Sequence, residues 1–434
     1  MNKFLIVLIA LLVAQSPLVA QGWIKTYYDY GSNWITGFGE KTLDNGYVTV
    51  GHIGISGSNL HVKKTDAFGN VQWTYSMNKV GSQASVGIKQ VPSTGGYLIL
   101  YNDSQLQSSP HLLSLDAMGQ EVYDRTINIG MDVYTGSSKT DLLITAEQDL
   151  LITSGAPDSL NFYTVGLAKL DLAGNTIWSK LIYHAPNYQT RPMDVLETTD
   201  GNYLLSCQID TSVGVSGGGN GSQIHLIKTD TAGNDLWRTT LASLGPKHRP
   251  FDAINSSDGG YLIMGDYNWG SNAQALTVKV NATGQLEWDW KSVSTSTSNK
   301  CRGAVENTDG TYTITGYIVP TAPPYNTVGF IKLSATGALL LDNGSSTGTN
   351  VPNGKKIYTN GSGGYSIFGV DAKGHFIITT ASLGVLYSNQ VVGKYFHDVN
   401  ANCIYDAGEP LILNRPVYAT KGTKTRYEKT TPKG

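Results

Sequence analysis

A glycine-rich composition, an internal repeat and a series of short apolar segments between turns together predict an all-β fold. The chain has 434 residues, of which 50 are Gly and 25 are Tyr, while only 15% are charged. Frequent Gly suits a protein with many tight turns, and few charges suit strands that are buried on both faces. The net charge of −2 and the lack of a basic run argue against nucleic-acid binding.

The start of the chain has the pattern of a secretory signal peptide. A short positive segment precedes an apolar run over residues 4–14, and a cleavage site is expected after Ala20 or Gln21. The apolar run is shorter than the roughly 20 residues that span a bilayer. We therefore predict that residues 1–21 are removed, that there is no transmembrane segment, and that the protein is secreted or held at the outer cell surface.

A ten-residue motif recurs six times without gaps. Asp, Asn or Ser stands third, at positions 66, 116, 171, 230, 281 and 334, and Gly always stands sixth. The third residue can cap a turn and Gly accepts a left-handed conformation, so each copy predicts a β-hairpin, which in five of the six copies closes on an aromatic strand residue. We expect the Lys that opens most copies to pair near the turn Asp. The copies are KTDAFGNVQW (64–73), SLDAMGQEVY (114–123), KLDLAGNTIW (169–178), KTDTAGNDLW (228–237), KVNATGQLEW (279–288) and KLSATGALLL (332–341).

A second motif precedes each hairpin and consists of a tight turn followed by a short apolar strand. Each unit then supplies about four short strands, and repeated four-stranded units are typical of the blades of a β-propeller. The copies are DNGYVTVG (44–51), TGGYLIL (94–100), QDLLITSG (148–155), DGNYLLS (200–206), DGGYLIMG (258–265), DGTYTITG (309–316) and a seventh, GGYSIFG (363–369), which has no matching hairpin.

The spacing also predicts how the ring closes. Trp73 precedes the next turn, at Thr94, by 21 residues, and Trp23 precedes the turn at Asp44 by the same interval. The last unit, over residues 363–388, lacks a Trp strand of its own. We therefore predict that the N-terminal strand completes a seventh blade of a propeller over residues 22–388, with six or eight blades as alternatives.

These motifs resemble those of the secreted β-propeller repeat proteins of Bacteroidota, in which a DGGY-type turn and a K-x-D-x-x-G-N-x-x-W hairpin recur at this spacing. The resemblance covers residues 22–388. It implies a secreted or surface protein of the kind that often carries a C-terminal sorting domain for type IX secretion. We identify no such sorting domain in this sequence.

Residues 389–434 carry a pattern of oxygen ligands that indicates a Ca²⁺ loop. Positions 1, 3, 5, 7, 9 and 12 of a twelve-residue loop suit calcium, although position 6 is Cys403 where an EF-hand has Gly. The segment resembles the opening of the B-type β-sandwich repeats of serine-aspartate-repeat adhesins, and its 46 residues imply an incomplete domain. The alternative is a polar linker without metal. The six expected ligands are Asp398, Asn400, Asn402, Ile404, Asp406 and Glu409.

One group of charged residues is a candidate ligand-binding site. Arg191-Pro-Met-Asp194 and Arg249-Pro-Phe-Asp252 occupy equivalent connections of two units, and Lys300 holds the place of Arg in the next unit. Connections that enter innermost strands lie near the mouth of the central channel, and loop charge on a rigid scaffold often binds ligands. The alternative is that Arg and Asp only brace neighbouring blades. Trp269, in the loop DYNWGSN, adds an aromatic candidate to this rim.

The sequence favours a binding function over catalysis. We predict no catalytic residue, because the G-x-S-x-G match at 214–218 lies in a Gly-rich insertion without the strand and helix of a nucleophile elbow. The expected protein is a non-enzymatic extracellular binding or scaffold module, monomeric or part of a larger chain, that recognises a protein or glycan. Alternatives are a propeller-based enzyme acting on glycans and a structural spacer in a larger adhesin.

Overall fold

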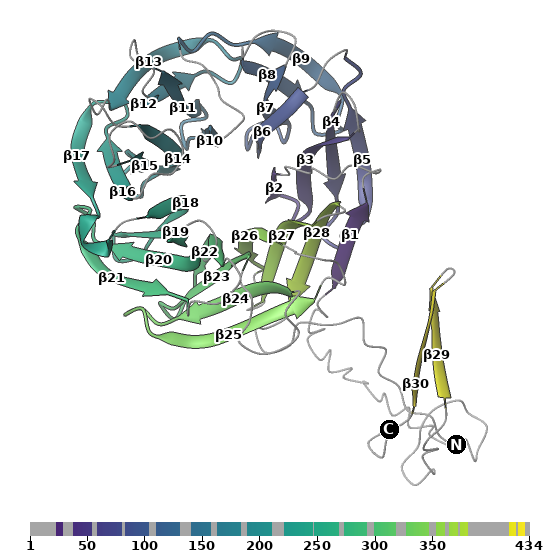
Figure 1. Cartoon of the computed structure of the whole chain (residues 1–434). Coiled ribbons are helices and arrows are strands. Elements are labelled where there is room, and N and C mark those ends of the chain that lie inside the picture. The colour runs from purple at the N-terminus through teal and green to yellow at the C-terminus, as the bar shows by residue number, and fades with distance from the viewer. Residues whose placement is uncertain are drawn as a thin grey trace, which may run out of the picture. The chain divides into compact units, whose positions relative to one another are not determined.

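A computed structural model places four-stranded sheets in a ring around a central axis (Figure 1). It describes residues 23–28, 38–53, 59–79, 83–103, 110–130, 140–157, 163–183, 189–210, 221–245, 247–268, 273–292, 299–317, 327–346, 353–360, 364–371, 374–380, 416–421 and 424–429. In this part of the chain there are seven such sheets. The predicted all-β, seven-bladed propeller is therefore confirmed.

Each blade is an antiparallel sheet whose strands follow one another outward from the channel. The innermost strands of blades I to VII are β2 (Phe38–Lys41), β6 (Gln83–Gln90), β10 (Asp141–Ile144), β14 (Thr190–Glu197), β18 (His248–Asn255), β22 (Lys300–Glu306) and β26 (Asn353–Thr359). The second strands are β3 (Tyr47–Ile53), β7 (Tyr97–Asp103), β11 (Leu150–Pro157), β15 (Tyr203–Asp210), β19 (Tyr261–Tyr267), β23 (Tyr312–Tyr317) and β27 (Tyr365–Asp371).

The outer half of each blade contains the predicted hairpin. The third strands are β4 (Asn59–Thr65), β8 (Pro110–Leu115), β12 (Tyr163–Leu170), β16 (Ser222–Thr229), β20 (Gln274–Val280), β24 (Thr327–Leu333) and β28 (Gly374–Thr380). The outermost strands are β5 (Val71–Ser76), β9 (Glu121–Thr126), β13 (Thr176–Tyr183), β17 (Asp235–Thr240), β21 (Leu286–Lys291), β25 (Leu339–Ser346) and, for blade VII, β1 (Ile24–Tyr28). A 3₁₀ turn (η2, Ala242–Leu244) follows β17.

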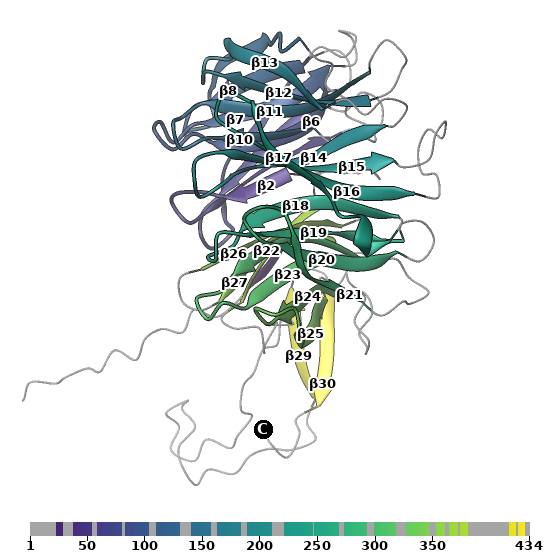
Figure 2. The same cartoon turned by 90° about the vertical axis from the view of Figure 1, so that its left-hand side faces the viewer.

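The core lies between neighbouring blades, because both faces of each sheet are covered. One cluster joins Val48 and Val62 of blade I to Ile99 and Leu113 of blade II, and all four side chains are fully buried. The side view in Figure 2 shows blades IV and V as neighbouring layers. Second strands such as β7 and β15 are buried along their whole length, which explains their continuous apolar runs.

The N-terminal strand closes the ring, as predicted. β1 pairs antiparallel with β28, so blade VII combines strands from opposite ends of the propeller. Trp23 and Tyr27 then contact blade I: the Tyr27 hydroxyl donates to the carbonyl of Gly69 at 2.7 Å, and a Cβ on Gly69 would lie 2.7 Å from the Trp23 ring. Blade VII has no covalent hairpin between its two outer strands, and this explains why the seventh turn motif has no hairpin motif.

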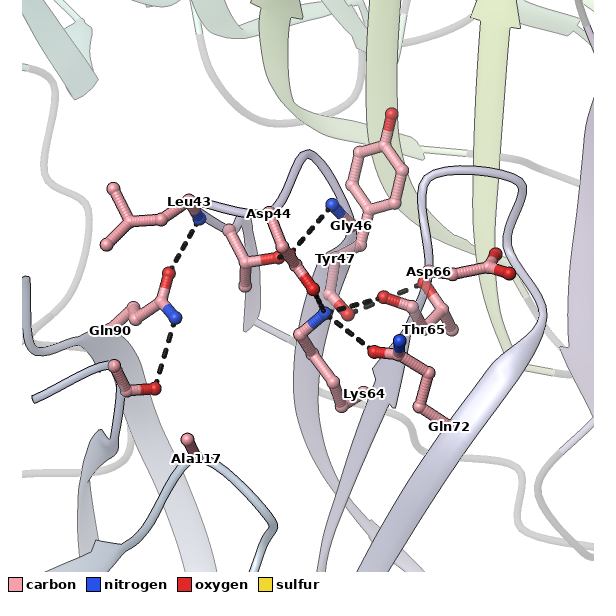
Figure 3. Close-up of polar contacts among 12 residues, drawn as sticks. Leu43, Asp44, Gly46, Tyr47, Lys64, Thr65, Asp66, Gln72, Gln90 and Ala117 are labelled. Carbon is pink, nitrogen blue, oxygen red and sulfur yellow. Dashed lines mark hydrogen bonds and ion pairs between the residues drawn. The ribbon is translucent and has the colours of Figure 1, made fainter.

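The recurring Lys braces the two motifs in five of the units, and Figure 3 shows the pair in blade I. Lys64 Nζ lies 2.7 Å from Asp44 Oδ2, 2.8 Å from the carbonyl of Thr65 and 3.0 Å from Gln72 Oε1. The partner is thus the Asp of the preceding turn, whereas Asp66 of the hairpin caps its own loop. Equivalent pairs are Lys169–Asp149, Lys228–Asp200, Lys279–Asp258 and Lys332–Asp309.

The chain divides into two compact units, Met1–Leu386 and Tyr387–Gly434. In the second unit, β29 (Pro416–Lys421) and β30 (Lys424–Lys429) form an antiparallel hairpin. Within the described segments, the structure has no helix that is long and apolar enough to cross a membrane. Cys207 and Cys301 are buried free thiols, and Cys403 lies outside the described residues.

Candidate binding site at the central channel

Four charged side chains from four blades meet where the innermost strands converge. Asp141, Asp194 and Asp252 lie on β10, β14 and β18, and all three carboxylates act on Lys356 of β26. Side chains from blades III, IV, V and VII can interact only near the propeller axis, which the innermost strands surround in Figure 1. We call these four residues the channel cluster.

The channel cluster occupies one level of the strand register. Each member lies opposite the fourth residue of its neighbouring second strand: Asp141 opposite Thr153, Asp194 opposite Ser206, Asp252 opposite Met264 and Lys356 opposite Phe368. A β-bulge directly precedes Asp194, Asp252 and Lys356. Because bulges reorient a strand locally, they help to set the direction of these side chains.

The carboxylates of the channel cluster connect their blades to later ones. Asp194 Oδ2 accepts the backbone N–H of Ala253 at 2.9 Å, and Asp141 Oδ2 accepts that of Val195 at 3.4 Å. Asp252 Oδ1 lies 2.7 Å from Lys356 Nζ, across blade VI. These bonds agree with the bracing role that the sequence left open for the Asp residues.

Gly303 occupies the same level in blade VI and makes room for Lys356. A Cβ at Gly303 would lie 2.9 Å from the carbonyl oxygen of Lys355 and 3.1 Å from the Cα of Lys356. A side chain there would push β26 away. The close approach of the two innermost strands therefore requires glycine at this position.

Burial and mutual repulsion change the protonation of the channel cluster. The pKa of Asp194 is raised well above its ordinary value, mainly by desolvation and to a smaller extent by the nearby carboxylates of Asp252 and Asp141. Burial acts to lower the pKa of Lys356, but the carboxylates of Asp252, Asp194 and Asp141 outweigh it, and the net pKa is raised. Lys356 therefore stays charged, while Asp194 keeps its proton to a higher pH than an ordinary aspartate does.

A second group, on the innermost strands of blades V and VI, is positively charged. The guanidinium carbon of Arg302 lies 3.5 Å from the ring centroid of Phe251, and that of Arg249 lies 4.8 Å from the same centroid. Arg249 also binds the fully buried carboxylate of Asp266 through two nitrogens, at 3.2 and 2.6 Å. Lys300 is close enough to interact with Arg249, Arg302 and Asp266. We call Arg249, Lys300, Arg302, Phe251 and Asp266 the cationic cluster.

The cationic cluster contains three basic side chains and one carboxylate. Desolvation, reinforced by the charge of Arg249, lowers the pKa of Arg302 to about 10 despite the opposing effect of Asp266. Desolvation and the neighbouring Arg302 also lower the pKa of Lys300. Positive charge is thus concentrated beyond what Asp266 can neutralise.

The structure divides the predicted rim into three parts. Arg191 pairs with Asp210 of its own blade at 3.0 Å, and both side chains are buried. Asp194 and Asp252 belong to the channel cluster, and Arg249 and Lys300 belong to the cationic cluster. Trp269 lies outside the described residues, and so do all six predicted calcium ligands, Asp398, Asn400, Asn402, Ile404, Asp406 and Glu409.

Sequence reasoning missed Asp141, Lys356 and Arg302. The repeat spacing contains a signal for Asp141 and Lys356. Each member of the channel cluster stands nine positions before the first residue of the second strand of its blade. Those strands begin at Leu150, Tyr203, Tyr261 and Tyr365. The R-P-x-D pattern is absent before Asp141 and Lys356. Arg302 is the bulged residue of β22, opposite no partner in the register, and its position follows only from the fold.

Comparisons with known proteins found similar folds but no family. No family model matches the chain, and no curated protein matches it. Three solved structures illustrate the similarity. A protein of unknown function from Dyadobacter fermentans is 11% identical, with a TM-score of 0.47, over 82% of this chain and 98% of that one. A polysaccharide lyase is 11% identical, with a TM-score of 0.48, over 85% and 94%. The α-L-arabinanase of Penicillium chrysogenum is 9% identical, with a TM-score of 0.48, over 85% and 100%.

Proposed function

We propose that this seven-bladed β-propeller is a non-enzymatic extracellular or cell-surface module that binds a protein or glycan near the mouth of its central channel. The observation that carries the proposal is a difference between the acidic and the basic side chains at the innermost strands: the acidic ones are buried and bonded, and the basic ones are partly accessible. Asp194 and Asp252 are 6% and 4% exposed as whole residues, and their carboxylates are engaged in bonds between blades. Arg302 and Lys300 are partly accessible, and among the described residues no carboxylate pairs with either. The site therefore offers groups that bind rather than groups that transfer protons.

An enzyme acting on glycans is the second candidate, and one observation favours it. A carboxyl group with a raised pKa beside two further carboxylates is typical of general acid catalysis. Asp194 has these properties. Binding is nevertheless favoured over catalysis, because the buried Asp194 carboxylate would have to release the Ala253 N–H to reach a substrate.

The two candidates differ in turnover. We expect the secreted chain to be retarded in native gels that contain an acidic or neutral polysaccharide, while the same polymers gain no new reducing or unsaturated ends during long incubation. New ends that disappear in Asp194→Asn, but persist in Asp116→Asn, would contradict the proposal and favour an enzyme. Asp116 is a suitable control because Asn281 fills the same hairpin position. If the polysaccharides neither retard the chain nor are cleaved by it, a structural spacer would be favoured.

The C-terminal unit is proposed to be a calcium-stiffened extension of this module, and export to the cell surface is proposed with it. Both rest on sequence patterns, namely the loop that begins at Asp398 and the apolar run at residues 4–14. Ca²⁺ at roughly 100 times its dissociation constant should stabilise the unit by about 2.7 kcal/mol. Thermal unfolding with Ca²⁺ and with Mg²⁺ measures this effect, which Glu409→Gln should remove. An unfolding temperature that is the same in millimolar Ca²⁺ and in chelator would exclude the loop.

A further inference from the structure

The cationic cluster has an unbalanced charge that the fold itself does not explain. Asp266 is fully buried and already bound by two nitrogens of Arg249. Among the described residues, Arg302 has no hydrogen-bond acceptor, and its Nε is buried without a partner. A desolvated cation without a counter-charge is costly, so an arrangement of this kind is expected where an anion from outside completes it.

The geometry of Arg302 prepares it for such an anion. Its guanidinium lies over the Phe251 ring at 3.5 Å, which fixes the plane of the group. Its terminal nitrogens bind no described residue, and the residue as a whole is partly exposed. A planar guanidinium with a free edge matches the two oxygens of a carboxylate or sulfate.

The neighbouring side chains supply the rest of a site. Lys300 is the first residue of β22 and Arg249 the second residue of β18, so both lie at the ends of innermost strands, beside the channel. Both are partly accessible, and the Arg249 side chain is 25% exposed. Three cations that are close enough to interact with one another then favour an oxyanion over a neutral ligand.

We propose that Arg302, Lys300 and Arg249 bind the carboxylate or sulfate group of an acidic polysaccharide. The inference rests on the proposed binding function and names its ligand class. A slender polysaccharide can bring its charged substituents to recessed side chains on innermost strands, whereas the broad surface of a folded protein reaches them poorly. An acidic polypeptide is therefore treated as a competing outcome.

The test measures affinity for polygalacturonate, which carries carboxylates, and dextran sulfate, which carries sulfates, with neutral dextran as the reference. We expect binding to at least one polyanion and none to dextran. Arg302→Gln and Lys300→Gln should each weaken that binding about tenfold, the usual effect of losing a charge-assisted hydrogen bond. Free galacturonate and inorganic sulfate as competitors distinguish the two oxyanions.

Arg125→Gln is the matched control. Arg125 also stacks on an aromatic ring, 4.2 Å from the centroid of Tyr123, but it is exposed on the outermost strand β9. It should bind the polyanion with unchanged affinity. Thermal unfolding checks each variant, and if Arg302→Gln does not fold, the more peripheral Lys300→Gln decides the test.

Several results would overturn the inference. Variants that bind the polyanion as tightly as the unaltered chain would place the binding elsewhere on the surface. Binding to poly-glutamate but to neither polysaccharide would mean that the ligand class is wrong. Binding to neutral dextran alone would refute the anion site and leave the proposed binding function intact, whereas cleavage of any polymer would refute the proposed function itself.

Discussion

Asp194 shows how one buried carboxyl group can make the stability of the propeller depend on pH. Its pKa is raised by burial and by the carboxylates of Asp252 and Asp141. The folded state therefore binds a proton that the unfolded chain has already lost above its ordinary pKa of 3.8. Folding is favoured at low pH, and this contribution is lost as the pH rises through the raised folded pKa.

Asp194→Asn should remove this dependence, because asparagine imitates the protonated acid and can still accept the Ala253 N–H. Its stability relative to the unaltered chain should grow by about 1.4 kcal/mol per pH unit, from pH 3.8 to the raised folded pKa. Urea unfolding at a series of pH values measures the difference. A difference between the two proteins that does not change with pH would refute the assignment.

At the scale of the elements, five of the six hairpin Gly residues, all except Gly174, are covered by an aromatic residue from the preceding blade. A Cβ on Gly119 would lie 2.5 Å from the Trp73 ring, and one on Gly284 would lie 2.5 Å from Trp237. The Trp73 indole also donates to the carbonyl of Ala117 at 3.1 Å. In blade VI, Leu341 stands at the position that Trp holds in most other blades. The next blade, blade VII, has no covalent hairpin that a Trp at this position could cover.

Gly119→Ala should therefore cost more than its backbone conformation alone. Gly119 has φ 79°, a left-handed value that costs other residues roughly 1 to 2 kcal/mol. Overpacking against Trp73 should add about 1 to 3 kcal/mol. Gly259→Ala isolates the first effect, because Gly259 has φ 85° with nothing within 4 Å of its added Cβ. Equal losses in chemical denaturation would show that the Trp–Gly contact contributes nothing.

At the scale of the whole molecule, the ring is held closed without a disulfide among the described residues. Closure depends on five residues of β1 that pair with β28 and on Trp23 and Tyr27, which contact blade I. A propeller without β1 exposes the unpaired edge of β28, and exposed edges associate with other chains.

Deletion of residues 22–28 should lower the unfolding temperature by about 10 °C or more, since each kcal/mol corresponds to roughly 2 °C in a domain of this size. Light scattering should rise as the free β28 edge pairs between molecules. A peptide of residues 22–28, added in trans, should restore both properties by strand addition. A scrambled peptide serves as the control, and a deletion variant with unchanged unfolding would contradict closure by β1.

The sequence alone determined the blade and the closing strand, and it favoured the seven blades that the structure has over six or eight. Turn and strand preferences are local, and every blade repeats them. The hairpin Gly was therefore enough to predict the blade, and the spacing of Trp23 from Asp44 was enough to predict the closing strand. The sequence also identified two sets of equivalent positions, because the repeat spacing fixes the register. One set is Arg191, Arg249 and Lys300, and the other is Asp194 and Asp252.

Only the tertiary structure decided which of these side chains meet. Arg191 pairs with Asp210 of its own blade, Asp252 binds Lys356 across Gly303, and Arg249 shares the Phe251 ring with Arg302. Contacts between blades depend on how closely the innermost strands converge and on where a bulge turns a side chain. Neither quantity is set by local preference, so the charges that face the channel become apparent only once the ring is closed.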